Sequence, residues 1–377
     1  MSDHEQETLA LLKLSLCSGV GNRLMFTLVD HFGSARAALE APVERLTSLR
    51  GIGQDLAHSL RKGPDPADVD RELDLMERFR VRLVPFFSED YPPPLRHLDA
   101  DAPALLRVKG DYLPKDRLAL ALVGSRRATE YGRGVARRMA GELASAGFTV
   151  ISGLARGVDS AAHRGALEAG GRTVAVLGNG LAHELTPRRA KLAQQIVSGG
   201  ALISELPMAV PPLPGNFDPR NRIISGLSLG VVVVEAAARS GSLITARHAG
   251  EQGRAVFAVP GPANSPSSQG CHALIRDGAV LVTSARQVME GLGPLSEPIE
   301  LPDEETGPPA ESVRDARVMA LSDRQRDVLG LLGSSALHID EVIGKTGLAP
   351  SIVSSILLTL EIRGLVRQEA GQRYVRA

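Results

Sequence analysis

Short apolar runs alternate with amphipathic segments through the middle of the chain. The runs are apolar at consecutive positions, which is typical of strands buried on both faces of a parallel sheet. They cover residues 118–123, 149–151, 173–177, 201–204, 229–234, 255–259 and 279–282. Segments with helical spacing of apolar residues lie between them, at 132–146, 159–169, 191–198 and 243–252. This alternation predicts an α/β fold with an extended Rossmann-like parallel sheet core over residues 115–292.

Residues 1–63 show the pattern of several short helices. Gly19-Val20-Gly21 and Gly51-Ile52-Gly53 each form a turn that an amphipathic helix follows. Such a pair is typical of a helix-hairpin-helix (SAM-like) domain, in which backbone N–H groups at helix N-termini contact phosphate. Glycine serves tight helix–helix turns as well, so a small helical packing module without DNA contact stays open as the alternative.

Three further segments complete the predicted organisation. Residues 64–114 contain several prolines and predict a connector with one helix and one or two strands. Residues 293–315 are rich in Pro and Glu and predict an acidic flexible linker. Residues 316–377 predict a winged helix domain. Its helices are expected at 321–332, 338–346 and 351–363, and its strands at 365–368 and 373–376.

The charge of the chain is unevenly distributed, although 43 Lys and Arg balance 43 Asp and Glu overall. Residues 115–295 carry 20 basic against 12 acidic side chains, whereas residues 296–312 carry 6 acids and no base. A basic central domain can attract a polyanion by steering and counterion release. Basic residues also scatter over any protein surface, so charge alone leaves both interpretations open.

Composition excludes several classes of protein. No run of about twenty apolar residues is present, and the N-terminal segment lacks the apolar region of a signal peptide. The two cysteines, Cys17 and Cys271, lie far apart and predict neither a disulfide framework nor a zinc cluster. We therefore expect a cytoplasmic protein without a metal, a cofactor or a membrane partner.

Glycine, serine and arginine follow three of the predicted strands. The strand ends carry Gly124-Ser125-Arg126, Ser152-Gly153-Leu154-Ala155-Arg156-Gly157 and Gly178-Asn179-Gly180. Ligands of parallel sheets bind outside the carboxyl ends of the strands, and these residue types suit a phosphate. The alternative is that each is an ordinary strand-to-helix turn, which needs glycine only for its geometry.

The segment 216–228 places an aromatic residue beside basic ones in what we interpret as a loop before a core strand. Phe217 is expected to stack on an unpaired base, while Arg220 and Arg222 hold the nucleic-acid backbone. Aromatic residues make up only 3% of the chain, which makes this position informative. In the alternative, Phe217 packs into the core and the arginines pair with nearby acids.

No nucleotide fingerprint accompanies these turns. Gly178-Asn179-Gly180 lacks the third glycine of the dinucleotide motif, and the Walker A motif is absent from the sequence.

Five ordered blocks of the sequence together resemble the DprA/Smf family (DNA-processing protein A). The blocks are Val123–Arg126, Ser152–Asp159 with Ala162-His163, Arg220–Ser228, Val231–Thr245 and Phe257–Gly261. The resemblance covers roughly residues 115–285, and the helical N-terminus and the winged C-terminus fit the same architecture.

This resemblance implies a function and a set of partners. It implies a homodimer that binds and protects single-stranded DNA and helps to load RecA recombinase during natural transformation and homologous recombination, without enzymatic activity. Double-stranded DNA is a further expected partner of the terminal domains. The pattern and the resemblance together give these DNA-binding residues: Gly124, Ser125, Arg126, Ser152, Gly153, Arg156, Gly157, Asn216, Phe217, Arg220, Asn221, Arg222, Ser240, Gly241 and Ser242.

Two loops depart from the family pattern. The run after the third core strand is Gly180-Leu181-Ala182, where the family has Gly-Leu-Asp followed by a Tyr-Pro pair. Asp218 follows Phe217 where the family prefers proline. An acid beside a phosphate groove is electrostatically unfavourable. The resemblance therefore does not by itself assign DNA contacts to these two loops.

Two other function classes compete with this prediction. Ser240–His248 is similar in position to the PGGxGTxxE motif of nucleotide phosphoribohydrolases, but His248 stands where those enzymes need their catalytic glutamate. A ligand-responsive transcription factor would read duplex DNA through its winged helix. The expected recognition helix, residues 351–360, carries neither arginine nor lysine.

Overall fold

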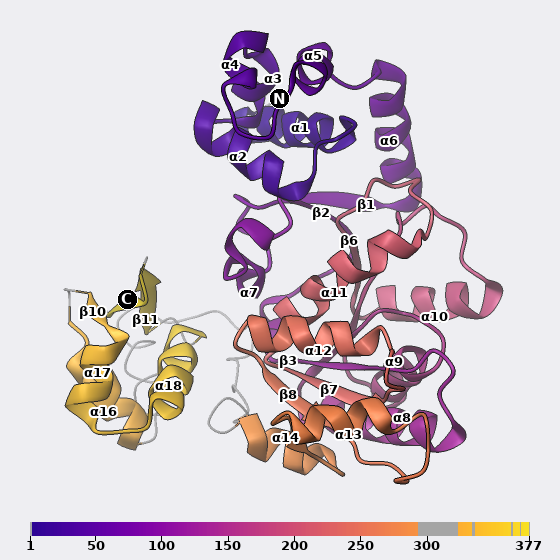
Figure 1. Ribbon diagram of the computed structural model, residues 1–377, viewed down its shortest axis with the longest axis vertical. Helices are drawn as coiled ribbons and strands as arrows, with labels where there is room; N and C mark the ends of the chain where they lie inside the picture. Colours follow the sequence, from indigo (N-terminus) through magenta and orange to yellow (C-terminus); the bar gives the residue numbers. More distant parts are fainter. Residues whose placement is uncertain (1, 293–322, 334–335, 363–364, 370, 377) are drawn as a thin grey trace, which may run out of the picture. The chain divides into compact units, whose positions relative to one another are not determined.

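Nine strands form one sheet in the order β1-β2-β6-β5-β4-β3-β7-β8-β9 (Figure 1). The strands from β6 to β9 in that order run parallel, and β1 and β2 lie antiparallel at one edge. Their bounds are β1 Val81–Pro85, β2 Leu105–Gly110, β3 Ala119–Gly124, β4 Thr149–Ser152, β5 Thr173–Val176, β6 Ala201–Ser204, β7 Gly230–Glu235, β8 Ala255–Ala258 and β9 Val280–Leu281. The predicted Rossmann-like parallel sheet is confirmed, and the segment predicted as a connector adds two strands to it.

The computed structural model describes residues 2–292, 323–333, 336–362, 365–369 and 371–376. The chain divides into two compact units, residues 1–285 and 286–377. The predicted acidic linker, residues 293–315, lies outside the described residues.

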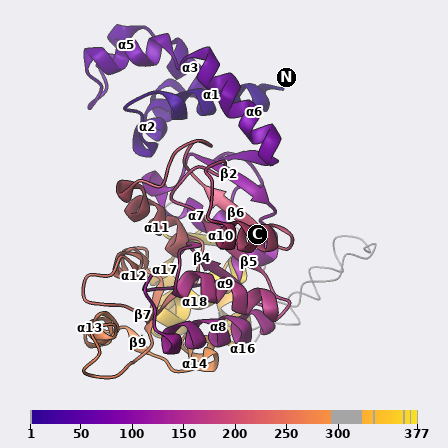
Figure 2. The same cartoon turned by 90° about the vertical axis from the view of Figure 1, so that its right-hand side faces the viewer.

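Helices cover both faces of the sheet (Figures 1 and 2). One face carries α8 Glu130–Ser145, α9 Val158–Glu168 and α10 Pro187–Val197, and the other carries α11 Phe217–Gly226, α12 Ser242–Glu251 and α13 Gln269–Arg276. Because side chains of a strand alternate between faces, Ala119, Ala121 and Val123 of β3 face the α11–α12 layer. The double cover explains why the core strands are apolar at consecutive positions.

The helix α11 corrects our interpretation of residues 216–228 as a loop. The buried positions of α11 are Arg220, Asn221, Ile223, Ile224, Ser225 and Gly226, and the buried Leu227 follows directly. One of these buried positions is an arginine, and Pro219 lies in the first turn, where proline is tolerated. A charged residue on the buried face and a proline in the first turn both weaken the helical pattern of apolar residues, so hydrophobic periodicity does not predict this helix. The helices α13 and α14 (Ala285–Leu292) were not predicted either.

The N-terminal helices pack on the antiparallel edge of the sheet, where Ala104 and Leu105 of the β2 region join their core. They are α1 Asp3–Leu16, α2 Asn22–Phe32, α3 Ala35–Glu40, α4 Val43–Thr47, α5 Gln54–Lys62 and α6 Pro66–Phe79. A four-residue helix, α7 Pro93–Arg96, lies between β1 and β2.

The two predicted glycine turns differ in their surroundings. The first is docked, because the Asn22 amide bonds to the backbone of Ala102 and Ala104 and Arg23 pairs with Asp101 at 2.7 Å. At Gly51 and Gly53 of the second turn, no heavy atom lies within 4 Å of where a Cβ would stand. Gly21 of the first turn is equally uncrowded, so the two turns differ in the docking of Asn22 and Arg23 and not in the space around their glycines.

The second unit contains the predicted winged helix. Helices α16 Asp323–Leu331, α17 Ile339–Thr346 and α18 Pro350–Ile362 pack with a three-stranded sheet in the order β10-β12-β11. The strands are β10 Leu337–His338, β11 Val366–Glu369 and β12 Arg373–Arg376. Across the described ranges no single helix passes a test for a membrane span. Only the sharply bent pair of α17 and α18 passes it, by length and composition.

A buried histidine in α9 makes the stability of the core depend on pH. His163 is fully buried, and its Nδ1 lies 2.7 Å from the Thr173 hydroxyl oxygen, which donates its own proton to the Val150 carbonyl. The Nδ1–H of His163 therefore donates to Thr173. The other ring nitrogen, Nε2, is buried and has no hydrogen-bond partner among the residues that the structure describes. Burial, reinforced by the charge of Arg164, lowers the pKa of His163 to about 3.

We predict that the free energy of unfolding falls as the pH drops below about 6.5, the ordinary histidine pKa. Below that pH the histidine is protonated in the unfolded chain but stays neutral in the folded protein. The free energy of unfolding therefore falls by up to about 1.4 kcal/mol per pH unit. Urea unfolding at several pH values between about 7.5 and 5 measures it. The His163→Gln variant should lose this part of the slope, whereas His58→Gln, at an exposed position, should keep it. Equal slopes in all three proteins would contradict the assignment.

Candidate nucleic-acid interface

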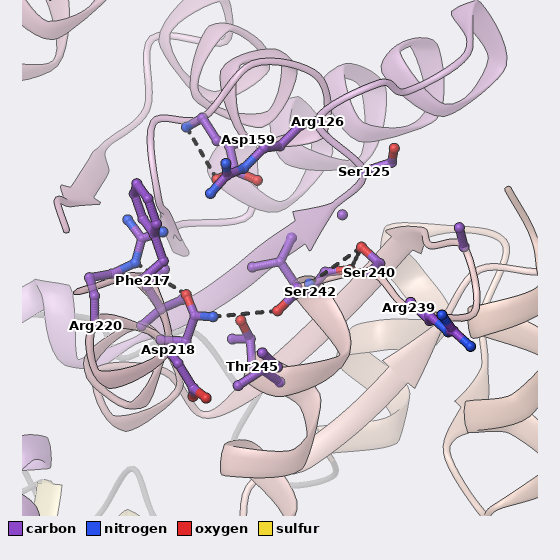
Figure 3. A pocket seen from close by; sticks show the side chains of 18 of the residues that line it. Ser125, Arg126, Asp159, Phe217, Asp218, Arg220, Arg239, Ser240, Ser242 and Thr245 are labelled. Carbon is purple, nitrogen blue, oxygen red and sulfur yellow. Dashed lines mark hydrogen bonds between the residues drawn. The ribbon is translucent and has the colours of Figure 1, made fainter. Parts of the chain in front are cut away.

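The candidate site lies where the order of the strands reverses. From β3 the chain proceeds through β4 and β5 to β6 on one side, then returns to β7 on the other side of β3 and proceeds to β9. In open parallel sheets the crevice at this reversal is the usual ligand site. Two hollows of about 610 and 740 Å³ open at this edge, and Figure 3 shows the first of them. We call them the switch-point pocket, between the ends of β3 and β7, and the β5-side pocket, between the ends of β4 and β5.

Arg126 and Phe217 line both pockets and stand between them. The guanidinium carbon of Arg126 lies 4.6 Å from the centroid of the Phe217 ring, a cation–π contact. A Cβ at Gly178 would lie 2.9 Å from the Phe217 ring, so this ring contacts Gly178 as well. Arg126 itself is exposed, and it has no ion pair among the described residues. Phe217 therefore supports Arg126, which presents its charge to solvent.

The loop after β4 is held in a constrained shape by Asp159. This buried carboxylate accepts hydrogen bonds from the N–H groups of Gly153 at 3.2 Å and Ala155 at 3.3 Å. Leu154 between them has a φ of +53°, which costs backbone energy that the surrounding contacts must offset. Burial raises the pKa of Asp159, while the nearby Arg220 and the two N–H groups act in the opposite direction. Asp159 thus fixes the shape of the loop after β4. Its carboxylate also offsets part of the positive charge of Arg126 and Arg220.

Arg220 occupies a different place from the one that we predicted for it. The side chain is buried at 6% exposure, and its Nη1 donates to the carbonyls of Val176 at 2.5 Å and Gly153 at 3.1 Å. Burial lowers the pKa of Arg220 to about 10, while Asp159 opposes that shift. Arg220 stays charged at neutral pH and ties α11 to the ends of β4 and β5. This geometry gives it a positioning role.

Its neighbours on α11 are also engaged. Arg222 pairs with Glu205 through both of its terminal nitrogens, at 3.0 and 2.6 Å, and both side chains are largely buried. Asn221 is buried at 7% exposure, although it still lines the switch-point pocket. Asn216 lies outside both pockets and donates to the Pro211 carbonyl at 3.4 Å. In the sequence we left open that the arginines of segment 216–228 pair with nearby acids instead of binding DNA. Arg222 does form such a pair.

The glycines and serines of the predicted site fall into two groups. Gly124 packs closely, since a Cβ there would lie 2.6 Å from Val158, and Gly157 has a φ of +82° against the Ser125 carbonyl. Ser152 is fully buried and donates to the Leu122 carbonyl at 2.6 Å, away from both pockets. These three positions serve the geometry of the turns, and Gly124 also lines the switch-point pocket. Ser125 lines the switch-point pocket, and its hydroxyl accepts from the Arg127 N–H at 3.1 Å.

The N-terminus of α12 forms the opposite wall of the switch-point pocket. Ser240, Gly241 and Ser242 line it, as does Thr245 one turn later. The two serine hydroxyls lie 2.8 Å apart, and Gly241 offers no side-chain cap to the helix. A helix N-terminus with two hydroxyls is favourable for an anionic oxygen.

Four further arginines line the pockets and were missed in the sequence. Arg127 and Arg239 line the switch-point pocket, and Arg188 and Arg189 line the β5-side pocket beside the predicted Arg156. Burial, together with the positive charges of Arg126 and Arg156, lowers the pKa of Arg189, so these cations repel one another. Pro187 at the first position of α10 is a helix-start signal, and it would have placed Arg188 and Arg189 at the sheet edge. We predicted that helix only from residue 191.

Asp218, the acid that seemed unfavourable here, is partly neutralised. Its Oδ1 lies 3.1 Å from Nε2 of His248 on α12, and 3.9 Å from the guanidinium of Arg247. Phe217 beside it still faces the pocket (Figure 3). Because Asp218 is engaged by these two side chains, it does not prevent a phosphate from binding on the opposite wall of the switch-point pocket.

Comparison with known proteins identifies the family. Residues 82–293 match the family model described as DNA recombination-mediator protein A, and residues 308–372 match the DprA winged helix domain. The chain belongs to the DprA/Smf family. This confirms the resemblance drawn from the five sequence blocks and the α/β fold with a C-terminal winged helix.

Individual relatives of the DprA/Smf family match different shares of the chain. Protein Smf of Escherichia coli is 50% identical over 226 residues, which are 59% of this chain and 60% of that protein. Protein Smf of Synechocystis is 32% identical over 392 residues, with 97% and 98% of the two chains covered.

Two solved DprA structures share the fold. The X-ray structure of DprA from Streptococcus pneumoniae superimposes with a TM-score of 0.66 at 33% identity, over 75% of this chain and 97% of that one. DprA from Helicobacter pylori, whose structure addresses its single-stranded DNA binding mode, gives a TM-score of 0.51 at 30% identity over 57% of this chain and 96% of that one.

We predict that Arg220→Lys destabilises this DprA/Smf protein by about 1–3 kcal/mol, because lysine loses the Nε–H bond to Asn221 and its compact, strongly hydrated ammonium costs more to bury than a guanidinium. Urea unfolding measures the change, and Arg156→Lys on the exposed loop is the matched control with unchanged stability. An Arg220→Lys protein as stable as the wild type would show that the buried guanidinium does not hold α11.

Proposed function

We propose that this protein binds single-stranded DNA along the carboxyl edge of the sheet and protects it there. The observation that carries this proposal is the row of arginines at the two pockets, most of which have no acidic partner among the described residues. Five of them, Arg126, Arg127, Arg156, Arg188 and Arg239, are exposed. Like charges held close together are relieved by a polyanion, and binding would release the counterions of the strand.

The base-stacking element in this proposal is Arg126 backed by Phe217. Because Phe217 already contacts Gly178 and Arg126, an incoming base stacks on the guanidinium plane of Arg126, while the N–H edge of the same guanidinium forks onto the adjacent phosphate. Ser240, Ser242 and the N-terminus of α12 receive a phosphate on the far wall of the switch-point pocket. Such stacking and backbone contacts tolerate any sequence.

The biological role follows from the family. We propose that the protein acts in the cytoplasm and helps to load RecA recombinase onto the bound strand in natural transformation and homologous recombination. The single-stranded DNA binding mode named for the Helicobacter pylori relative supports the ligand in this proposal. Duplex binding through the terminal domains stays a prediction. The second glycine turn is open for it, whereas the apolar residues of α18 are largely buried.

The protein is proposed to work without turnover of a substrate. The competing phosphoribohydrolase needs a catalytic acid where His248 stands, and His248 is bonded to Asp218. Incubation with nucleoside monophosphates, followed by chromatography for free base, distinguishes the two functions. Release of base above the uncatalysed rate would favour the enzyme.

We predict that Arg126→Ala weakens single-stranded DNA affinity by about ten- to a hundredfold, the loss of one charge-assisted forked contact. The loss should be similar across sequences, and the slope of log affinity against log salt should fall by about one phosphate. Arg126→Lys should rescue only part of the affinity, because an ammonium cannot stack or fork.

Fluorescence anisotropy with labelled oligonucleotides measures these affinities. The control is Arg138→Ala on α8, an exposed arginine paired with Glu142 at 3.8 Å and remote from both pockets. The melting temperature of Arg126→Ala should equal that of the wild type. Unchanged affinity in Arg126→Ala with normal melting would refute the proposed interface.

We further propose a homodimer formed through the edge strand β9. Val280 and Leu281 on this strand are 47% and 48% exposed, and no other strand of the described residues pairs with its outer edge. An exposed apolar edge strand is suited to an isologous contact with a second copy.

We predict that Leu281→Lys converts a dimer at micromolar concentration into a monomer. Light scattering measures the mass, with Leu73→Lys on the exposed face of α6 as the control. A wild-type monomer at high concentration would refute this assembly.

A further inference from the structure

Tyr131 is an exposed aromatic side chain whose exposure the fold does not explain. It lies in the first turn of α8 and is 55% exposed, the highest value among the exposed large hydrophobic residues of the described ranges. The chain has only 12 aromatic Phe and Tyr residues and no Trp. A solvent-exposed aromatic ring that packs against little of its own chain is a common sign of a binding contact.

The contacts of α8 place Tyr131 on the same sheet edge as the two pockets. Its hydroxyl donates to the Pro260 carbonyl at 3.3 Å, and Pro260 follows β8 by two residues. Thr129, at the start of α8, donates to the Glu235 carboxylate at the end of β7 at 2.7 Å. The first turn of α8 therefore lies over the carboxyl ends of β7 and β8. In the sheet, β8 is two strands from β3, or about 10 Å from the strand that carries Arg126.

The surroundings of Tyr131 are suited to a nucleic-acid strand. Arg127 and Arg239, both exposed, line the switch-point pocket on the side of β3 and β7. The Glu235 carboxylate and the Thr129 hydroxyl already cap the first turn of α8, and Glu130 in that turn pairs with Arg133, so the two exposed arginines supply the positive charge. The ring is held at its hydroxyl end by Pro260. An exposed ring with one fixed end, on the same sheet edge as exposed arginines, is suited to a sequence-tolerant base platform.

We propose that Tyr131 is a second base-stacking platform, which extends the path of single-stranded DNA from the Arg126–Phe217 stack past β7 to the end of β8. This inference rests on the proposed function, because it assumes that a single strand occupies the switch-point pocket. It adds a contact at one end of that path and predicts that the strand leaves the pocket toward β8.

The sequence supplies a direct spectroscopic test. The chain has no Trp, so its intrinsic emission comes from four tyrosines. Tyr91 and Tyr374 are buried, Tyr112 is partly buried, and Tyr131 is the exposed one. Titration of the full chain with unlabelled oligothymidine should therefore quench tyrosine emission as a base stacks on Tyr131. The Tyr131→Phe protein, titrated in the same way, gives the baseline for light absorbed by the DNA and should show no further quenching.

Affinity measurements complete the test. Tyr131→Ala should lower affinity for a strand of about 16 nucleotides by about 5- to 150-fold, the range for loss of one base–aromatic stack. Tyr131→Phe keeps the ring and should bind within about twofold of the wild type. Phe87→Ala, at another exposed aromatic on the turn after β1, is the matched control and should bind normally.

The outcomes separate this inference from the proposed function. Wild-type affinity in Tyr131→Ala, together with weakened binding in Arg126→Ala, would overturn the second platform and leave the interface intact. Unquenched wild-type emission at saturating DNA would overturn it as well. A changed mass in light scattering with unchanged DNA affinity would assign Tyr131 to a protein contact instead. If neither the wild type nor any variant binds single strands, the proposed function itself fails.

Discussion

The guanidinium of Arg220 holds the carboxyl ends of two strands to the helix that carries Phe217. Its contacts with Gly153 and Val176 satisfy carbonyls at the ends of β4 and β5, and its charge lies beside Asp159. A buried arginine is tolerable only where hydrogen bonds and a counter-charge offset its desolvation. Gly153 leaves room for it, since a Cβ there would lie 2.8 Å from the guanidinium. Once this contact forms, the positions of the β4 loop and of Phe217 are coupled.

The exposed arginines depend on that arrangement. Phe217 backs Arg126, and the loop held by Asp159 carries Ala155 and Arg156 to the pocket wall. Burial, and after it the positive charges of Arg126 and Arg156, lowers the pKa of Arg189, so these cations also repel one another in the free protein. A fold keeps such mutual repulsion only when the rest of the core is stable enough to tolerate it, and such conflicts are expected at functional sites. The double-covered sheet supplies that stability through its continuous apolar strands.

Sequence reasoning succeeded where local pattern and global fold agree. The core strands and most helices between them were predicted near their observed bounds, because apolar runs and helical periodicity report burial directly. It failed at α11, where the buried face includes a charged residue. It also separated residues 64–114 from the sheet. The antiparallel pairing of β2 with β6 joins residues about a hundred positions apart, and no local pattern reports such a contact.

The same division holds for the site. The sequence alone determined the α/β class, the winged helix, the family and the sheet edge at which a ligand would bind, because glycine, serine and arginine follow strands whose carboxyl ends share one edge. It could not determine which arginine faces solvent. Arg126, Arg220 and Arg222 are the same residue type in the sequence. In the structure Arg126 is exposed, Arg220 donates to buried carbonyls and Arg222 pairs with Glu205. Only the tertiary structure decides this, because the partner of each long side chain comes from a different strand or helix, and its burial depends on how those elements pack.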